Sequence, residues 1–197
     1  MAAKKEKGKR RQRGKTKSHG KVMYLRFGAM ILTAMVVMYW VMFLGSWEPS
    51  HVRFSQSRVF MALTMGGTMG LVMLAWMLNM YKNTALNLVI VGASILLFAL
   101  GIFLDRSQIT VQDVGFMRAM IPHHSLAITR SERAEISDVR VCRLAVRISE
   151  AQRKEIGEME WLIQDIQENG LAETVEEAEG RWLPGFHEPA VRECPGD

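Results

Sequence analysis

Six side chains in the second half of the chain are of types that bind soft metal ions. They are Met117, Met120, His123, His124, Glu155 and Met159. The first four are separated by three, three and one residues and share a broad helix face, and the last two are four residues apart and share another. Thioether sulfur and imidazole nitrogen suit copper, chiefly Cu(I), better than hard cations do. The six residues therefore predict a copper site if the fold brings the two faces together.

Two helices within residues 105–170 must position these side chains. The first is predicted to begin near Thr110, a capping residue, and to be kinked by Pro122, which lacks an amide hydrogen. The second is predicted to begin after Asp138 and to end at Asn169-Gly170. They form an antiparallel hairpin.

The turn of this hairpin is expected near Ser137, which sets His123 at the level of Glu150. The six side chains then fall within about two helical turns, roughly 10 Å, and can converge on one ion. Met117 and Met159 also lie on apolar stripes, so the alternative is that they are ordinary core residues.

The second helix has an apolar stripe whose spacing alternates between three and four residues, which is typical of a helix that buries one face. The stripe consists of Val141, Leu144, Ala145, Ile148, Ala151, Ile156, Met159, Leu162, Ile163 and Ile166. A lone two-helix hairpin buries little apolar surface. We therefore expect a homodimer or higher homo-oligomer that pairs hairpins into a four-helix bundle, through Leu144, Ile148, Ile156 and Leu162.

Three apolar stretches before the hairpin are long enough to cross a membrane as helices. They cover residues 22–44, 59–80 and 85–104, so that residues 22–104 form a transmembrane region. The second stretch carries a methionine at every fourth position, at Met61, Met65, Met69, Met73 and Met77. This stripe is either a thioether ladder for a soft ion or flexible apolar filling of a membrane helix.

Positive charge at the N-terminus predicts the orientation. Residues 1–21 hold ten Lys or Arg and one acid, a net charge of +9, whereas residues 105–197 hold eleven bases and eighteen acids, a net charge of −7. The positive-inside rule places the basic tail, predicted to be disordered, in the cytoplasm. Three crossings then place residues 105–197 outside, as in a multi-pass protein of the bacterial inner membrane with a periplasmic domain. The tail has no aromatic residue before Tyr24, so we expect it to contact anionic lipid and not nucleic acid.

The two cysteines, Cys142 and Cys194, include no CxxC pair, which excludes a disulfide framework and a four-thiolate zinc site. A single bridge between them is compatible with an oxidising compartment. Cys194 belongs to an acidic tail containing Pro and Gly, residues 171–197, to which the sequence assigns no function. No catalytic nucleophile or base stands out, so we expect a protein that is not an enzyme.

Two segments carry a family resemblance. Phe116–His124 (FMRAMIPHH), followed by Ala127-Ile128, and Ala151–Met159 (AQRKEIGEM) resemble the signature of the domain-of-unknown-function family numbered three hundred and five. The resemblance covers about residues 108–168, and the whole chain is similar to a bacterial subset with three N-terminal spans. It implies a ferritin-like helical fold. Because some relatives are periplasmic copper-binding proteins, it also implies metal ligands at Met117, Met120, His123, His124 and Met159, with Glu155 as a further candidate.

These observations predict an all-α membrane protein with three transmembrane helices followed by an extracytoplasmic helical hairpin. The leading function is that of a membrane-anchored periplasmic copper-binding protein that buffers Cu(I) or hands it on. One alternative is a non-enzymatic membrane scaffold that binds a periplasmic protein partner. A further alternative is a Cu(I) permease that uses the methionine stripe.

Overall fold

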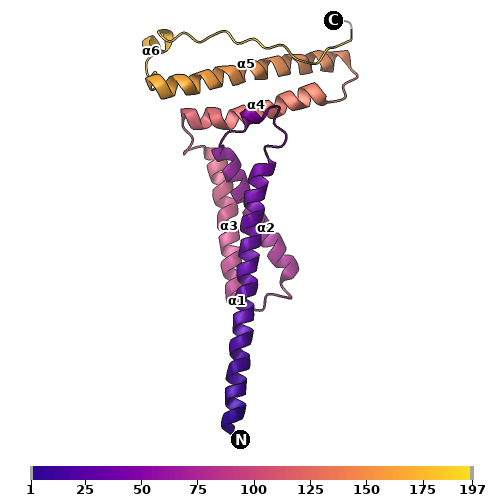
Figure 1. Ribbon diagram of the computed structural model, residues 1–197, viewed down its shortest axis with the longest axis vertical. Helices are drawn as coiled ribbons and strands as arrows, with labels where there is room; N and C mark the ends of the chain where they lie inside the picture. Colours follow the sequence, from indigo (N-terminus) through magenta and orange to yellow (C-terminus); the bar gives the residue numbers. More distant parts are fainter. Residues whose placement is uncertain (1, 196–197) are drawn as a thin grey trace. The chain divides into compact units, whose positions relative to one another are not determined.

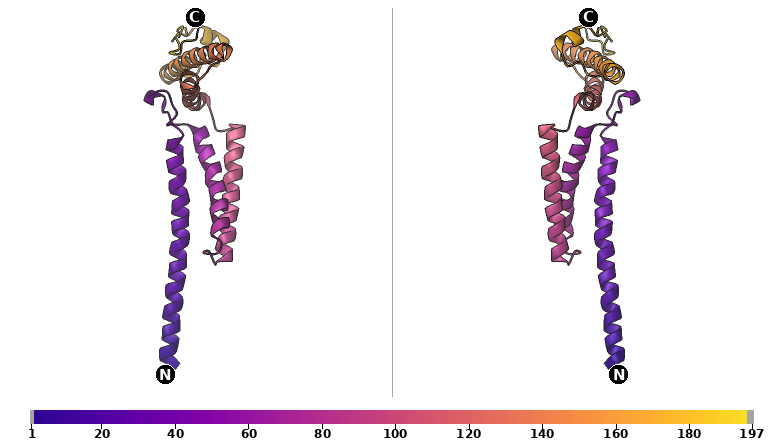
Figure 2. Two further views of the ribbon diagram at one scale, coloured as in Figure 1. Left: turned by 90° about the vertical axis from the view of Figure 1, so that its right-hand side faces the viewer. Right: turned by 90° about the vertical axis from the view of Figure 1, so that its left-hand side faces the viewer.

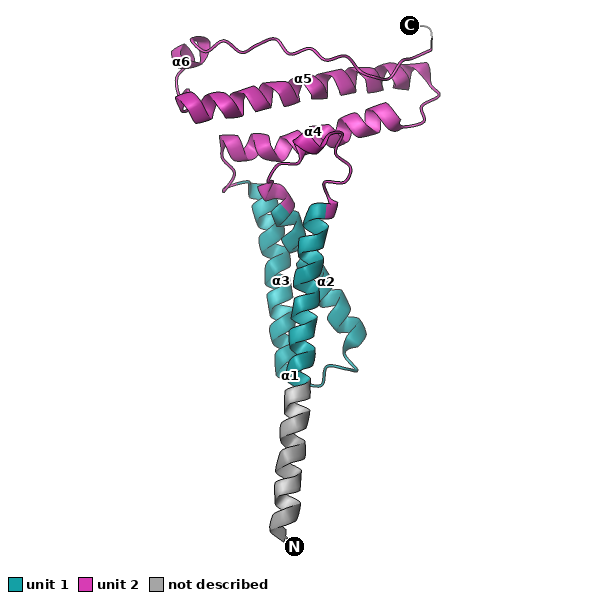
Figure 3. Ribbon diagram, in the orientation of Figure 1, with its two compact units in different colours: residues 1–40, 59–108 teal, residues 41–58, 109–197 magenta. Residues whose placement is uncertain are grey.

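The computed structural model describes residues 20–195, and every regular element in this part of the chain is helical (Figure 1). This confirms the all-α prediction. The chain divides into two compact units, which Figure 3 colours separately: residues 1–40 with 59–108, and residues 41–58 with 109–197. The basic tail predicted over residues 1–21 lies, apart from its last two residues, outside the described residues.

The first unit consists of three long helices (Figures 1 and 2): α1 (Ala2–Val41), α2 (Gln56–Met77) and α3 (Thr84–Ser107). Their segments Gly20–Val41, Gln56–Met77 and Thr84–Ser107 are each long and apolar enough to cross a membrane. Three helices that could cross a membrane are therefore present, and their ends lie within three residues of the predicted spans.

Small residues allow α2 and α3 to approach each other closely. A Cβ atom on Gly67 would lie 2.5 Å from the carbonyl oxygen of Ser94, and one on Gly101 would lie 2.8 Å from that of Phe60. Because backbone atoms cannot move aside, these two positions have no room for a larger side chain.

The methionine stripe of α2 does not form one continuous surface. Met69, Met73 and Met77 pack against the core of this unit, which contains Phe27, Ile31, Leu74 and Tyr81. Met61 and Met65 are exposed. Met69, Met73 and Met77 therefore serve as core packing, as expected for flexible apolar side chains in a helix bundle.

The second unit is built on the antiparallel hairpin of α4 (Asp113–Arg133) and α5 (Val139–Asn169), which lie side by side (Figure 1). A one-turn helix, η1 (Pro49–His51), from the chain between α1 and α2 packs on α4. The short helix α6 (Val175–Glu179) follows α5. The core consists of Met117, Ile121, Ile128, Ile156, Met159 and Ile163, with Trp47, Val114, Met120, Leu162 and Ile166 packed against it.

The ends of α5 follow the prediction, but the start of α4 does not. Asp138 caps α5 by accepting a hydrogen bond from the Arg140 amide at 2.8 Å, and Gly170 ends it with a positive φ of 78°. The cap residue of α4 is Gln112, which makes no side-chain cap bond, so the predicted cap at Thr110 is wrong. Because α3 extends to Ser107, Thr110 falls in the turn that follows it.

Candidate functional site

The predicted ligands Met117 and Met159 lie in the core of the hairpin. Met117 is 6% exposed and Met159 is 8% exposed, and both pack among the isoleucines of α4 and α5. Such thioethers contribute apolar contacts and fill irregular space. In this structure they correspond to the alternative that the sequence left open, ordinary core residues.

The histidine pair occupies two different environments. The side chain of His124 is 12% exposed, whereas His123 faces solvent, and their ring centroids are 6.2 Å apart. The helix α4 continues on both sides of the buried Pro122, next to this pair. Of the two rings, only His124 is therefore turned towards α5.

The partner of His124 on α5 is Glu155. Its carboxylate oxygen Oε2 lies 3.0 Å from His124 Nδ1, and the same oxygen accepts a hydrogen bond from Gln152 Nε2 at 3.1 Å. The Nδ1 atom is buried and has no partner in hydrogen-bond geometry, so its contact with Glu155 is electrostatic. A buried nitrogen without a hydrogen bond is costly and needs an explanation.

This pairing differs from the predicted register, in which His123 faces Glu150. Residues 135–138 between the helices form neither a helix nor a tight turn. The two helices are therefore offset along their axes, and counting outwards from the midpoint of the connection gives the wrong levels. The pair in the structure is His124 and Glu155. His124 lies one position after the predicted His123, and Glu155 lies five positions after the predicted Glu150.

The environment of His124 keeps its ring neutral. Burial lowers the pKa of His124 below its ordinary value of 6.5, the nearby Glu155 carboxylate opposes this, and His123 adds to the lowering. The pKa remains below the ordinary value, so the imidazole is unprotonated at neutral pH. A neutral imidazole nitrogen is the form that binds metal ions.

The remaining predicted ligand, Met120, is partly buried at the edge of the core and lies one helical turn before His124. No group of three or more His, Cys, Asp or Glu side chains within residues 20–195 is arranged to hold a metal ion. A metal at this position therefore depends on His124, Glu155 and the thioether of Met120, with His123 beside them. This donor set and the orphaned Nδ1 atom fit a soft or borderline ion.

A second polar cluster, centred on Ser125, is not predicted from the sequence. Ser125 is fully buried, accepts a hydrogen bond from the Trp47 amide at 2.7 Å, and lies 2.9 Å from His51 Nδ1. These contacts fasten the loop between α1 and α2 to α4. No local spacing reveals them, because they join residues more than 70 positions apart.

Arg153 and Glu132 form a buried ion pair between α5 and α4. Their side chains are 4% and 3% exposed, and Glu132 accepts hydrogen bonds from the Ser149 hydroxyl and the Val191 and Arg192 amides. Burial alone would raise the pKa of Glu132, but these bonds and Arg153 outweigh it and hold the pKa below its ordinary value. The carboxylate is therefore charged and fixed.

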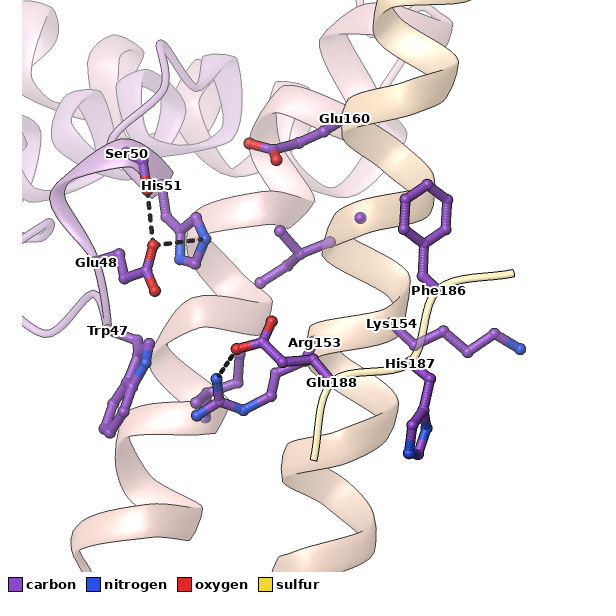
Figure 4. A pocket seen from close by; sticks show the side chains of 13 residues that line it. Trp47, Glu48, Ser50, His51, Arg153, Lys154, Glu160, Phe186, His187 and Glu188 are labelled. Carbon is purple, nitrogen blue, oxygen red and sulfur yellow. Dashed lines mark hydrogen bonds and ion pairs between the residues drawn. The ribbon is translucent and has the colours of Figure 1, made fainter. Parts of the chain in front are cut away.

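The chain after α6 lies along α5 as an extended segment, residues 181–195, which we call the strap. The disulfide Cys142–Cys194 joins the strap to α5. Figure 4 shows strap residues Phe186, His187 and Glu188 on one side of a cavity of about 380 Å³, with Trp47, Glu48, Ser50 and His51 on another and α5 between them. This cavity is a second concave site that the sequence does not predict.

Comparisons with known proteins give one curated relative and one family model. The chain is 28% identical over 116 residues to an uncharacterized protein of Acanthamoeba polyphaga mimivirus. The matched segment covers 58% of this chain and 74% of that protein. No solved structure matches the chain. Residues 113–189, which comprise α4, α5, α6 and part of the strap, match the model of the family described as Domain of unknown function (DUF305), the family that the two sequence segments resemble.

Proposed function

We propose that this protein is a membrane-anchored, extracytoplasmic metal-binding protein whose hairpin binds copper as Cu(I) and buffers the ion or hands it on. The observation that carries the proposal is the buried Nδ1 atom of His124, which has no hydrogen bond and lies 3.0 Å from the Glu155 carboxylate. Met120 lies one helical turn before His124 and would add a thioether, and the solvent-facing His123 ring, 6.2 Å from that of His124, is available as an outer ligand. When bound, the Cu(I) ion would add a single positive charge to this face of α4, and the role of the protein side chains would be to coordinate it.

The orientation is supported by three independent features. The bases at the N-terminus favour a cytoplasmic start. The disulfide Cys142–Cys194 favours an oxidising compartment for the second unit. Residues 41–58 and 109–197 belong to one unit, which requires an even number of crossings between them, and α2 and α3 supply two. We therefore infer that this unit lies in the periplasm when the host is a bacterium.

A titration of the full-length protein in detergent with Ag(I), a redox-stable stand-in for Cu(I), tests the metal proposal. We expect Ag(I) to bind more tightly than Zn(II), because zinc gains little from thioether sulfur. His124→Ala and Met120→Leu should each weaken Ag(I) binding by about tenfold or more. The matched control is His187→Ala, which removes a histidine outside this face and should leave the affinity unchanged.

Two outcomes would contradict the proposal. Wild-type protein that fails to bind Ag(I) would exclude a soft-metal site. Equal affinities in wild type and in the folded His124→Ala variant would show that any bound ion sits elsewhere. Thermal unfolding of each variant separates lost ligands from lost structure.

One observation favours the scaffold alternative. Val141, Leu144 and Ile148 of α5 are 47%, 48% and 38% exposed and form a ridge along one side of the helix. An exposed apolar ridge of this kind marks an interaction surface. Replacing Leu144 and Ile148 by glutamine should abolish partner capture in the scaffold case and leave Ag(I) affinity intact. The broken methionine stripe of α2 gives the permease alternative no comparable support.

A further inference from the structure

The strap, residues 181–195, lies outside the apolar cluster at the centre of the second unit, although its Cys194 is buried. No residue of the strap belongs to the apolar cluster of α4, α5 and Trp47. Within the strap, Trp182 is 77% exposed and Val191 is 68% exposed. The hairpin core therefore stays intact if the strap leaves its position.

Polar contacts hold the strap along its length. Arg181 pairs with Asp165 at 3.0 Å near the end of α5. In the middle, Glu188 pairs with Arg153 at 2.6 Å, although its side chain is 62% exposed. Near the other end, the Arg192 guanidinium donates to the carbonyl oxygens of Ser131 and Glu132 at the end of α4. Glu188 is exposed, whereas the other partners in these contacts are buried or partly buried. A contact with an exposed partner contributes little, so the middle of the strap is the part held least firmly.

The disulfide provides the covalent attachment. It links Cys194 to Cys142 in the first turn of α5, across 52 positions of sequence. Because the strap lies inside the loop that this crosslink closes, the bond keeps the Cys194 end of the strap next to α5. Cutting this bond leaves the strap with the polar contacts alone.

Three groups lie under the strap. The Arg153 guanidinium donates a hydrogen bond to the Glu188 carboxylate. The Glu132 carboxylate accepts hydrogen bonds from the backbone amides of Val191 and Arg192. Phe186 covers Gly157 so closely that a Cβ atom there would lie 2.7 Å from its ring. Phe186, His187 and Glu188 also form one side of the 380 Å³ cavity (Figure 4).

We propose that Cys142–Cys194 is a redox latch, which holds the strap on α5 and whose reduction releases the strap to open the cavity while the hairpin core stays folded. The reductant is a protein dithiol. One of its thiolates attacks a sulfur of the disulfide, and two electrons and two protons pass from the dithiol to Cys142 and Cys194 as the dithiol becomes a disulfide. Both sulfurs are buried, but Glu193 and Pro195 beside Cys194 are exposed, so a small opening of the strap exposes the bond. The latch is independent of any metal at His124.

Hydrogen–deuterium exchange of the full-length protein in detergent, with and without reductant, tests this latch. The amides of Val191 and Arg192 are direct reporters, because their hydrogen bonds to Glu132 exist only while the strap is docked. Reduction should speed exchange in the strap by about tenfold or more, while peptides covering 117–128 and 156–163 keep their protection. Reoxidation should restore the original pattern.

Variants sharpen the test. A Cys142→Ser, Cys194→Ser double variant should exchange like the reduced protein and ignore reductant. Glu188→Gln removes a polar contact of the strap, so it should speed strap exchange further only after reduction, and Glu176→Gln on α6 is the matched control. If the strap amides stay protected after reduction, the disulfide only stabilises the fold and does not control the position of the strap, and the proposal is overturned. Loss of protection in the core together with the strap would overturn it as well.

Discussion

At the scale of single residues, Ser125 has the most consequential position in the second unit. Its buried hydroxyl group contacts both the Trp47 amide and the His51 ring, so one small side chain joins the loop between α1 and α2 to α4. His124, the candidate ligand, immediately precedes it in the chain. The candidate ligand and the loop attachment are therefore adjacent on one turn of α4.

We predict that Ser125→Ala destabilises the second unit. The variant leaves the Trp47 amide without its acceptor inside the protein, and an unsatisfied buried donor costs about 1–3 kcal/mol. Thermal unfolding followed by circular dichroism should show a lower midpoint. Ser131→Ala, a serine on the same helix without a buried hydroxyl contact of this kind, is the control and should unfold like the wild type. An unchanged midpoint for Ser125→Ala would contradict the assigned role.

Glu132 predicts how stability depends on pH. A carboxyl group with a lower pKa in the folded than in the unfolded protein stabilises the fold above its unfolded pKa, and this contribution disappears as the pH falls through the folded pKa. The ordinary value is 4.5, so the loss should begin at about pH 5 and be complete only below the lowered value. Unfolding midpoints measured from neutral to acidic pH should show that Glu132→Gln is less stable at pH 7 and converges with the wild type in acid. Glu135→Gln, an exposed neighbour, should show no such convergence.

At the scale of elements, α5 buries a face that its sequence only partly reveals. Hydrophobic spacing correctly identifies Ile156, Met159 and Ile163. In the first half of the helix it also identifies Ala145, but the buried face there further contains Cys142 and Ser149, together with Arg153 at mid-helix. Polar side chains can be buried there because Glu132 and the strap satisfy them, and those partners come from other parts of the chain. Spacing within one helix cannot anticipate them.

The apolar residues left outside form the ridge of Val141, Leu144 and Ile148, and we propose that a second copy of the protein covers it. Ile156 is buried and Leu162 packs on the core, so neither is available for the contact that the sequence suggests. Covering the ridge gains about 25 cal/mol for each Å² of apolar surface removed from water.

The measurement for this association is the protein mass from light scattering after size-exclusion chromatography, corrected for detergent. We expect the wild type to self-associate and the Leu144→Gln, Ile148→Gln double variant to shift towards the monomer. Val175→Gln changes an equally exposed apolar residue away from the ridge and should leave the mass unchanged. A monomeric wild type at micromolar concentration would rule the contact out.

At the scale of the whole molecule, the sequence predicts the spans well and the tertiary contacts poorly. Membrane helices are set by local hydropathy, which is readable from 20 or so consecutive residues. The attachment of the loop before α2 to the hairpin depends on contacts more than 70 positions apart, and the cavity is lined by residues from Trp47 to Glu188. The candidate site is intermediate: His124 and Glu155 were identified, but their pairing required the true offset of the helices.

The two-unit arrangement makes a topological prediction. Ser50 belongs to the second unit and Lys82 lies between α2 and α3, and both are exposed. In intact cells, a membrane-impermeant maleimide should label Ser50→Cys, and it should label Lys82→Cys only after permeabilisation. The reverse pattern would overturn the orientation. Labelling at both positions would show that α2 does not cross.

The loop carrying Trp47 and His51 belongs to a unit whose remaining residues begin only at position 109, after two membrane helices. During synthesis the loop therefore emerges long before Ser125 exists. Ribosomes add about 5–20 residues per second, so the loop waits several seconds for its partner. The second unit therefore cannot complete its fold until α2, α3 and α4 have been synthesised, which makes the attachment of this loop to Ser125 a late event in the folding of the chain.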